Sequence, residues 1–289
     1  MVTKNYTLSW QRHELRLGPR TTIMGIVNVT PDSFSDGGRF HAKDAAVAQA
    51  LRLVESGADI IDIGGESTRP YADPVSAQKE LQRVIPVIEK LASDLPVPIS
   101  IDTTKSQVAA AAVKAGAAMI NDISALRADP DMALVVAESG VPVILMHMQG
   151  QPHDMQVKPE YADVVAEVGR FLAEAIDRAV AAGIMRDKII IDPGIGFGKT
   201  GRHNLLLMRR LEEFKRLDAP LLVGTSRKRF IREILNPVGR GDLPPELPRV
   251  ETGTQATVAA AVMRGAHIVR VHNVANTRAT VDVIDAIIR

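Results

Sequence analysis

Eight short apolar runs recur along the chain with helical segments between them. Each run is rich in Ile and Val, which is typical of parallel strands buried on both faces. The spacers carry the 3.6-residue periodicity of amphipathic helices, as in residues 44–58 and 77–92. Repeated strand and helix units of this length predict a (β/α)8 TIM barrel. The predicted strands are residues 22–28, 59–65, 98–103, 118–124, 142–147, 188–194, 220–226 and 267–273.

Residues 1–20 follow a different pattern from the rest of the chain. The segments YTLSW (6–10) and HELRL (13–17) alternate apolar and polar side chains like the two strands of a hairpin. We expect this N-terminal β-hairpin to cover the bottom of the barrel, where the strands begin. No linker divides the chain, so residues 1–289 are expected to form a single domain. The proline-rich patch at 236–249 is interpreted as an insertion after the seventh strand.

Charge and cysteine content exclude several classes of partner. The 289 residues carry a formal net charge of +1, which gives no general attraction to nucleic acid or to a membrane. The expected partner is therefore a small molecule. The lack of cysteine excludes disulfides, thiolate nucleophiles and cysteine-ligated metal centres. The N-terminal segment has no apolar core long enough for a signal peptide, and no segment reaches ~18 apolar residues, so we expect a cytoplasmic protein.

Polar side chains stand at or near the ends of six predicted strands, where a buried core would reject them. They are Asn28, Asp62, Asp102, Asn121, Asp192, Arg270 and His272. In a TIM barrel the carboxyl ends of the strands converge at the face where active sites are built. Any one of these residues could instead cap a helix or fix a turn. Seven together favour a functional site.

The segment from Gly25 to Phe40 leads from an apolar strand into a polar loop that ends in glycine. It carries more polar side chains than a simple connection of about 2 to 6 residues requires. Long ordered loops of this kind tend to be functional. We interpret Asn28 as a strand-end binding residue and the rest as a mobile loop over the site.

The strand-end residues suggest two subsites. Asp102, Asn121 and Asp192 supply acceptors and one amide, which suit the amino-pyrimidine edge of a heterocycle. A second group is cationic and suits an oxyanion, most simply phosphate: Arg69, Arg270 and His272. Asn28 is an oxygen ligand that could complete a Mg2+ site held mainly by substrate phosphate and water.

Two other patterns suggest sites that we reject. Residues 193–200, PGIGFGKT, resemble a phosphate-binding P-loop, but Pro193 stands where that motif requires glycine. The glycines are better interpreted as letting Phe197 and the backbone approach a ligand closely. His147 and His153 lack the spacing of zinc ligands, and we expect a structural hydrogen bond for His147.

Motifs over essentially the whole chain resemble those of the dihydropteroate synthase family. The matching segments are GIVNVTPDSFSDGG (25–38), DIGGESTRP (62–70), ISIDTTK (99–105), MINDIS (119–124), LMHMQG (145–150), DPGIGFGK (192–199), VGTSRK (223–228) and RVHNV (270–274). The resemblance implies a TIM-barrel transferase of folate biosynthesis that is usually a homodimer. The implied reaction joins 6-hydroxymethyl-7,8-dihydropterin diphosphate to 4-aminobenzoate and releases diphosphate with the help of Mg2+. Sulfonamides, which mimic aminobenzoate, are then expected to compete with it.

The resemblance also implies roles for individual residues. The implied pterin-binding residues are Asp102, Asn121, Met146, Asp192, Phe197, Gly224 and Lys228. The implied diphosphate-binding residues are Asn28, Arg69, Arg270 and His272, with Asn28 also serving the metal. The implied aminobenzoate-binding residues are Phe34, Thr68, Arg69, Pro70, Phe197, Ser226 and Lys228. The implied catalytic residues are Asp36, Asp102, Lys228, Arg270 and His272, and the loop that holds Asp36 would close over the reacting centre.

Two other functions are compatible with a pterin-binding barrel. A paralogue that binds pterin without synthesising pteroate would show erosion of the SRK block or of the 25–40 loop, and neither is eroded. A methyltransferase acting on a pterin ring would not need the diphosphate site that Arg69, Arg270 and His272 imply.

Thr225 stands where the family commonly has Met, and we expect this change to be tolerated.

Overall fold

The strands of the protein form a barrel. The computed structural model describes residues 4–29, 38–67, 73–236 and 241–288. Within them, eight parallel strands lie in the order β8-β7-β6-β5-β4-β3-β10-β9. Their bounds are β3 (Thr22–Asn28), β4 (Ile60–Gly64), β5 (Ile99–Asp102), β6 (Met119–Asp122), β7 (Val143–Met146), β8 (Ile189–Asp192), β9 (Leu222–Val223) and β10 (Ile268–Val271). A parallel bridge between Ile191 and Leu221 brings the two ends of this sheet together, so the barrel is nearly closed.

The predicted TIM-barrel fold is confirmed, and each predicted strand overlaps an observed one. β3 spans the predicted residues 22–28, and the other observed strands are shorter at their ends than the apolar runs, most clearly β9, which spans Leu222–Val223 within the predicted 220–226. β4 shows why the runs are so apolar, because all five of its residues are buried. Helices cover the outer face of the strands while side chains from other strands fill the inside.

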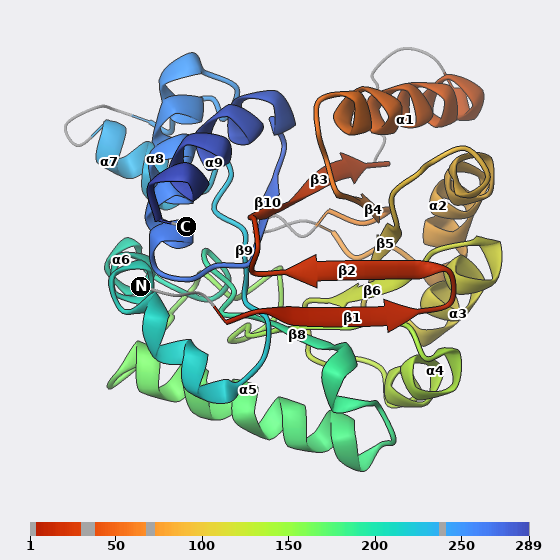
Figure 1. Cartoon of the computed structure of the whole chain (residues 1–289), viewed down its shortest axis with the longest axis horizontal. Coiled ribbons are helices and arrows are strands. Elements are labelled where there is room, and N and C mark those ends of the chain that lie inside the picture. Colours follow the sequence, from red (N-terminus) through yellow and green to blue (C-terminus); the bar gives the residue numbers. More distant parts are fainter. Residues whose placement is uncertain (1–3, 30–37, 68–72, 237–240, 289) are drawn as a thin grey trace.

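Helices surround the strands, as Figure 1 shows. They are α1 (Gly38–Glu55), α2 (Ala77–Ala92), α3 (Ser106–Ala115), α4 (Met132–Ser139), α5 (Val164–Ala181), α6 (Gly201–Arg209), α7 (Arg229–Leu235), α8 (Pro248–Met263) and α9 (Val274–Ile288), with short 3-10 helices at Arg186–Lys188 and Leu211–Leu217. In α2 the buried Val84, Val87, Ile88 and Leu91 recur at helical spacing. This apolar stripe is the local reason why the segment folds as a helix against the barrel.

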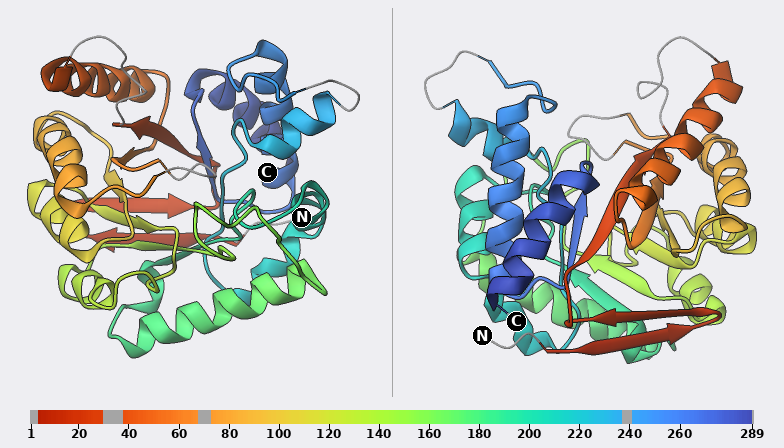
Figure 2. Two further views of the ribbon diagram at one scale, coloured as in Figure 1. Left: turned by 180° about the vertical axis from the view of Figure 1, so that it is seen from behind. Right: turned by 45° about the horizontal axis from the view of Figure 1, so that its top comes forward.

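The N-terminal hairpin consists of β1 (Tyr6–Trp10) and β2 (His13–Leu17), paired in antiparallel register. Its contacts lie where barrel strands begin. Lys188, just before β8, donates a hydrogen bond to the carbonyl of Ser9. His267, just before β10, packs its ring edge-on against Tyr6 at 5.2 Å between centroids. The hairpin therefore covers the bottom of the barrel, as predicted, and Figure 2 shows it beneath the strands in the right-hand view.

The loops that follow the strands lie at the opposite end of the barrel from the hairpin. The described part of the proline-rich patch follows α7 and ends in the first turn of α8, in the repeat that follows β9. Among the described residues, no helix is both long enough and apolar enough to cross a membrane.

Candidate active site

The predicted strand-end residues come together at the carboxyl ends of neighbouring strands. Asp102 is the last residue of β5 and pairs in register with Asn121 of β6. Gly64 of β4 lies between Asn28 of β3 and Asp102 in the register. A Cβ atom at Gly64 would lie 3.8 Å from Oδ2 of Asp102 and 3.9 Å from Oδ1 of Asn28. Both oxygens therefore border the space above Gly64, which the missing side chain keeps open.

Arg270 joins two of these strands by ion pairs. Its Nε donates to Oδ2 of Asp62 at 2.6 Å, and its Nη2 donates to Oδ2 of Asp102 at 2.6 Å. A guanidinium carries five N–H donors, and these two bonds fix its plane while using only two of them. The side chain predicted to bind an anion is thus held in one orientation by two carboxylates.

Asp62 is among the polar strand-end residues but has no role among the site residues that the resemblance implies, and the structure places it in contact with two of them, Arg270 and Asn121. Its side chain is fully buried in β4 and also accepts a hydrogen bond from Nδ2 of Asn121 at 3.2 Å. Its other oxygen, Oδ1, is buried without a hydrogen-bond partner among the described residues. A buried carboxylate is costly unless it is paired with a cation. Arg270 therefore stabilises the charge of Asp62, and Asp62 in turn orients the guanidinium of Arg270.

Burial perturbs the carboxylic acids of the site. It raises the pKa of Asp102 to about 7, against the opposing positive charge of Arg270. It also raises the pKa of Asp192 to about 6, although the Gly194 N–H donates to Oδ1 of Asp192 at 2.7 Å. Carboxylic acids that titrate close to neutral pH are common at functional sites.

Lys228 and Phe197 meet across the site. The Nζ atom of Lys228 lies 3.9 Å from the centre of the Phe197 ring, within the range of a cation–π interaction. Burial lowers the pKa of Lys228 to about 8, and the charge of Arg270 acts in the same direction. A Cβ atom at Gly196 would lie 2.9 Å from Cδ of Lys228, so glycine at this position lets the lysine lie against the loop.

A small apolar cluster separate from the main core lies beside these polar groups. It consists of Ile123, Met146, Met148, Met155 and Phe197. Met146 and Phe197 were predicted to line a pterin pocket, and the structure places them in one cluster. The flexible thioethers of methionine adapt well to flat ligand faces.

Ser226 and His272 connect two of the predicted subsites. The hydroxyl of Ser226 lies 3.0 Å from Nδ1 of His272, and it accepts a hydrogen bond from the His272 backbone N–H at 3.3 Å. The family resemblance assigns Ser226 to aminobenzoate and His272 to diphosphate, and the structure brings these two residues into contact. Gly224, two residues before Ser226, lies beside Arg270, because a Cβ atom there would be 3.7 Å from the Cβ atom of Arg270.

Five predicted site residues lie outside the described part of the chain. They are Phe34, Asp36, Thr68, Arg69 and Pro70. Among the described residues, no group of three or more His, Cys, Asp or Glu could hold a metal ion.

The predicted structural hydrogen bond of His147 is confirmed, because its Nδ1 lies 2.9 Å from Nζ of Lys199.

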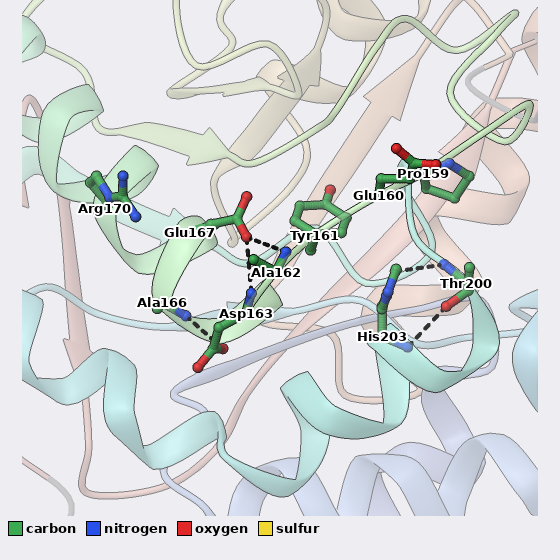
Figure 3. A pocket seen from close by; sticks show the side chains of 10 residues that line it. All are labelled: Pro159, Glu160, Tyr161, Ala162, Asp163, Ala166, Glu167, Arg170, Thr200 and His203. Carbon is green, nitrogen blue, oxygen red and sulfur yellow. Dashed lines mark hydrogen bonds between the residues drawn. The ribbon is translucent and has the colours of Figure 1, made fainter.

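A groove on the flank of the barrel has a volume of about 820 Å³ (Figure 3). It is lined by Pro159, Glu160, Tyr161, Ala162, Asp163, Ala166, Glu167, Arg170, Thr200 and His203. Its polar groups serve the adjoining helices. Asp163 caps α5, Thr200 and His203 form a capping box at the start of α6, and Glu167 accepts from the N–H groups of Ala162 and Asp163. We therefore assign no ligand to this groove.

Comparison with known proteins defines the class to which this barrel and its site belong. Residues 24–272 match the family of pterin binding enzymes. A dihydropteroate synthase of Escherichia coli strain K12 is 50% identical over 264 residues, which are 91% of this chain and 90% of that protein. A dihydropteroate synthase of Synechocystis is 48% identical over 272 residues, 94% of this chain and 92% of that protein. The fold and site are those of a pterin-binding TIM-barrel enzyme.

A solved structure leads to the same family. The dihydropteroate synthase of Xanthomonas albilineans, solved with 4-aminobenzoic acid, matches with a TM-score of 0.89 and 48% sequence identity, covering 98% of both chains. The chain therefore belongs to the dihydropteroate synthase family, as its motifs predicted.

Proposed function

We propose that the chain joins 6-hydroxymethyl-7,8-dihydropterin diphosphate to 4-aminobenzoate, giving 7,8-dihydropteroate and diphosphate for folate biosynthesis. The observation that carries this proposal is the buried array in which Arg270 bridges Asp62 and Asp102. It sets acceptors for an aminated heterocycle directly beside a cation for an oxyanion. A substrate with a pterin ring at one end and a diphosphate at the other meets both requirements.

The pterin ring is proposed to bind between the strand ends and the apolar cluster. Asp102, Asn121 and Asp192 would receive and donate hydrogen bonds along the amino-pyrimidine edge. Lys228 would reach the polar edge of the ring, and Met146 and Phe197 would contact its faces. Gly224 would leave room for the ring beside Arg270.

The diphosphate is proposed to lie towards β3 and β10. Arg270 and His272 would contact its oxygens, together with Arg69, whose role rests on the family resemblance. The Oδ1 atom of Asn28, which borders the space above Gly64 beside Asp102, is a hard oxygen donor of the kind that Mg2+ prefers. Bound Mg2+ would neutralise charge on the leaving diphosphate.

Aminobenzoate is proposed to bind beside Ser226, Phe197 and Lys228. The remaining contacts of this subsite, from Phe34, Thr68, Arg69 and Pro70, rest on the family resemblance. Because Ser226 contacts His272, the aminobenzoate and diphosphate subsites would adjoin each other at the carbon where the bond is exchanged.

The reaction requires cleavage of the bond between the pterin methylene carbon and a diphosphate oxygen. The electron-rich dihydropterin can stabilise positive charge on that carbon, so the bond can break before the new one forms. Arg270 and His272 would stabilise the departing diphosphate, and Asp102 with Asp36 would stabilise the cation. The neutral aminobenzoate nitrogen then attacks the carbon and loses a proton, which the released diphosphate can accept. It needs no strong base, so the enzyme mainly positions it and excludes water.

We also propose that the enzyme is a cytoplasmic homodimer, as the family resemblance implies. Sedimentation equilibrium of the purified protein tests the dimer, and a monomer at all concentrations would contradict it.

The proposed reaction is tested by measuring diphosphate release from the pterin substrate in the presence of Mg2+, with and without 4-aminobenzoate. We expect release and dihydropteroate formation to depend on aminobenzoate. Tight pterin binding without product would instead indicate a non-catalytic paralogue. Turnover that survives His272→Ala would indicate a reaction independent of diphosphate.

A further inference from the structure

Lys199 is a buried cation in the loop between β8 and α6. Its side chain is 2% exposed. Its Nζ atom lies 2.8 Å from the carbonyl of Phe197, 2.9 Å from that of Gly194, and 2.9 Å from Nδ1 of His147, with the His147 carbonyl at 3.4 Å. An ammonium group has only three hydrogens, so these acceptors take up its full donor capacity.

His147, on the loop that follows β7, is suited to accept from Lys199. Burial lowers the pKa of His147 to about 2, so the ring is neutral and Nδ1 can be an acceptor. Burial also lowers the pKa of Lys199 to about 7, against the attraction of Asp192. The lysine is costly to bury, and the hydrogen bonds it makes offset that cost.

The loop held by Lys199 packs tightly against the segment after β7. Gly194 and Gly198 have φ values of +67° and +61°, which favour glycine. A Cβ atom at Gly194 would lie 1.9 Å from the His147 carbonyl oxygen, and one at Gly198 would lie 2.4 Å from that of Gln149. The contact between the two loops therefore tolerates no side chain at Gly194 or Gly198. Lys199 is a buried polar link across it, in addition to Gln156 and Tyr161, which donate hydrogen bonds to the carbonyls of Gly196 and Gly198.

Phe197 is the residue through which this link reaches the active site. Phe197 is 8% exposed and belongs to the apolar cluster, and its ring lies under the ammonium of Lys228. Lys199 binds the backbone carbonyl of this same residue and that of Gly194. The hydrogen bonds thus fix the backbone from which the Phe197 ring projects.

We propose that Lys199 is a positioning residue that ties the β8–α6 loop to His147 and thereby sets the Phe197 ring for aminobenzoate binding. Lys199 touches no reacting atom and acts through Phe197. The inference rests on the proposed function, because it assigns the Phe197 ring to the aminobenzoate subsite. Phe197 and Asp192 also belong to the proposed pterin site, but Asp102 and Asn121, on strands β5 and β6, make no contact with this loop that the structure records, so pterin binding depends on Lys199 less than aminobenzoate binding does.

The variant Lys199→Met removes the ammonium group and keeps an unbranched side chain. We expect KM for 4-aminobenzoate to rise by up to about 100-fold, the effect of a displacement near 1 Å, with a much smaller change in KM for the pterin substrate. Lys188→Met is the matched control. Lys188 is also buried, 5% exposed, and donates to a backbone carbonyl, but it lies at the bottom of the barrel. Its loss should lower stability and leave both KM values unchanged.

Chemical rescue separates the positioning role from a general packing defect. The chain contains no cysteine, so Lys199→Cys introduces a single thiol. Alkylation of the unfolded variant with 2-bromoethylamine, followed by refolding, restores a lysine-like ammonium, whereas iodoethane adds a neutral chain. We expect the first treatment to restore the low KM for aminobenzoate and the second to leave it high. Equal restoration by both would overturn the role of the ammonium.

Hydrogen exchange tests the link without relying on activity. The backbone N–H groups of residues 194–199 should exchange faster in Lys199→Met than in Lys188→Met or the unaltered chain. A folded Lys199→Met variant with unchanged exchange and unchanged KM for aminobenzoate would overturn the proposal, as would an equal rise in both KM values. If the unaltered chain makes no dihydropteroate, the proposed function fails, and the exchange rates still decide whether Lys199 holds the loop.

Discussion

Replacing Asp62 by Asn tests how the buried ion pairs shape the active site. The change keeps the shape of the side chain and an acceptor for Arg270 Nε, but removes a charge from a fully buried position. A hydrogen bond to a charged group contributes about 1.5–3 kcal/mol. If that loss is fully expressed in transition-state binding, kcat/KM falls by about 10- to 150-fold.

The same change should alter the pH dependence in a defined direction. Burial is the main reason why the pKa of Asp102 is raised to about 7, with Arg270 opposing it, and the negative charge of Asp62 raises it further. Asp62→Asn removes that repulsion and leaves Arg270 in place, so the Asp102 pKa should fall. Because the ionised carboxylate is the active form, the acid limb of kcat/KM should move to lower pH.

The assay is kcat/KM for the pterin substrate measured between about pH 5 and pH 9. Asp59→Asn is a suitable control, because Asp59 precedes the same strand at the barrel bottom, where it pairs with Arg20 and accepts from the Ile23 N–H. The control should lose stability and keep the acid limb in place. An unshifted or raised acid limb in Asp62→Asn would refute the electrostatic reasoning.

Three further predictions concern the subsites and the buried histidine. Arg270→Ala should weaken binding of the diphosphate-bearing substrate more than that of the bare pterin, measured by calorimetry; equal losses would remove its role as an anion ligand. Sulfonamides should compete with 4-aminobenzoate in steady-state inhibition, and Ser226→Ala should weaken both, whereas non-competitive inhibition would contradict the shared subsite. Relative to a His147→Gln variant, the free energy of unfolding from urea titrations should decrease as the pH falls below about 6.5, because Asp102 and Asp192, whose raised pKa values act in the opposite direction, are common to both chains. The unfolded chain then binds a proton that buried His147, with its pKa lowered to about 2, does not; equal slopes in the two chains would count against the assignment.

The barrel could be predicted because its information is local. Ile and Val runs, helical periodicity and the order of the units define the strands without knowledge of distant contacts. The ends of β9 could not be predicted from composition. The apolar run that begins at Pro220 is longer than the strand, which spans two residues and stops before Gly224. Strand pairing, rather than composition, decides where such a strand ends.

The site could be predicted only in part, because its contacts join distant parts of the chain. The sequence identified Arg270 as a cation at a strand end, but its partner Asp62 is 208 residues away. Period-two alternation places Asp62 on the same face of β4 as Ile60 and Gly64 without showing which charge it meets. The sequence gives Lys199 no role of its own within the DPGIGFGK motif or the rejected P-loop pattern, because its partner His147 lies on another loop, 52 residues earlier.

The central claim is that the strand-end residues bind the pterin edge beside Arg270. The most direct measurement is a crystal structure of the protein soaked with a 7,8-dihydropterin that carries a diphosphate. The account predicts hydrogen bonds from the ring edge to Asp102, Asn121 and Asp192, with the diphosphate next to Arg270 and His272. A ring bound elsewhere, or bound in the reverse orientation with its diphosphate at Asp192, would contradict it.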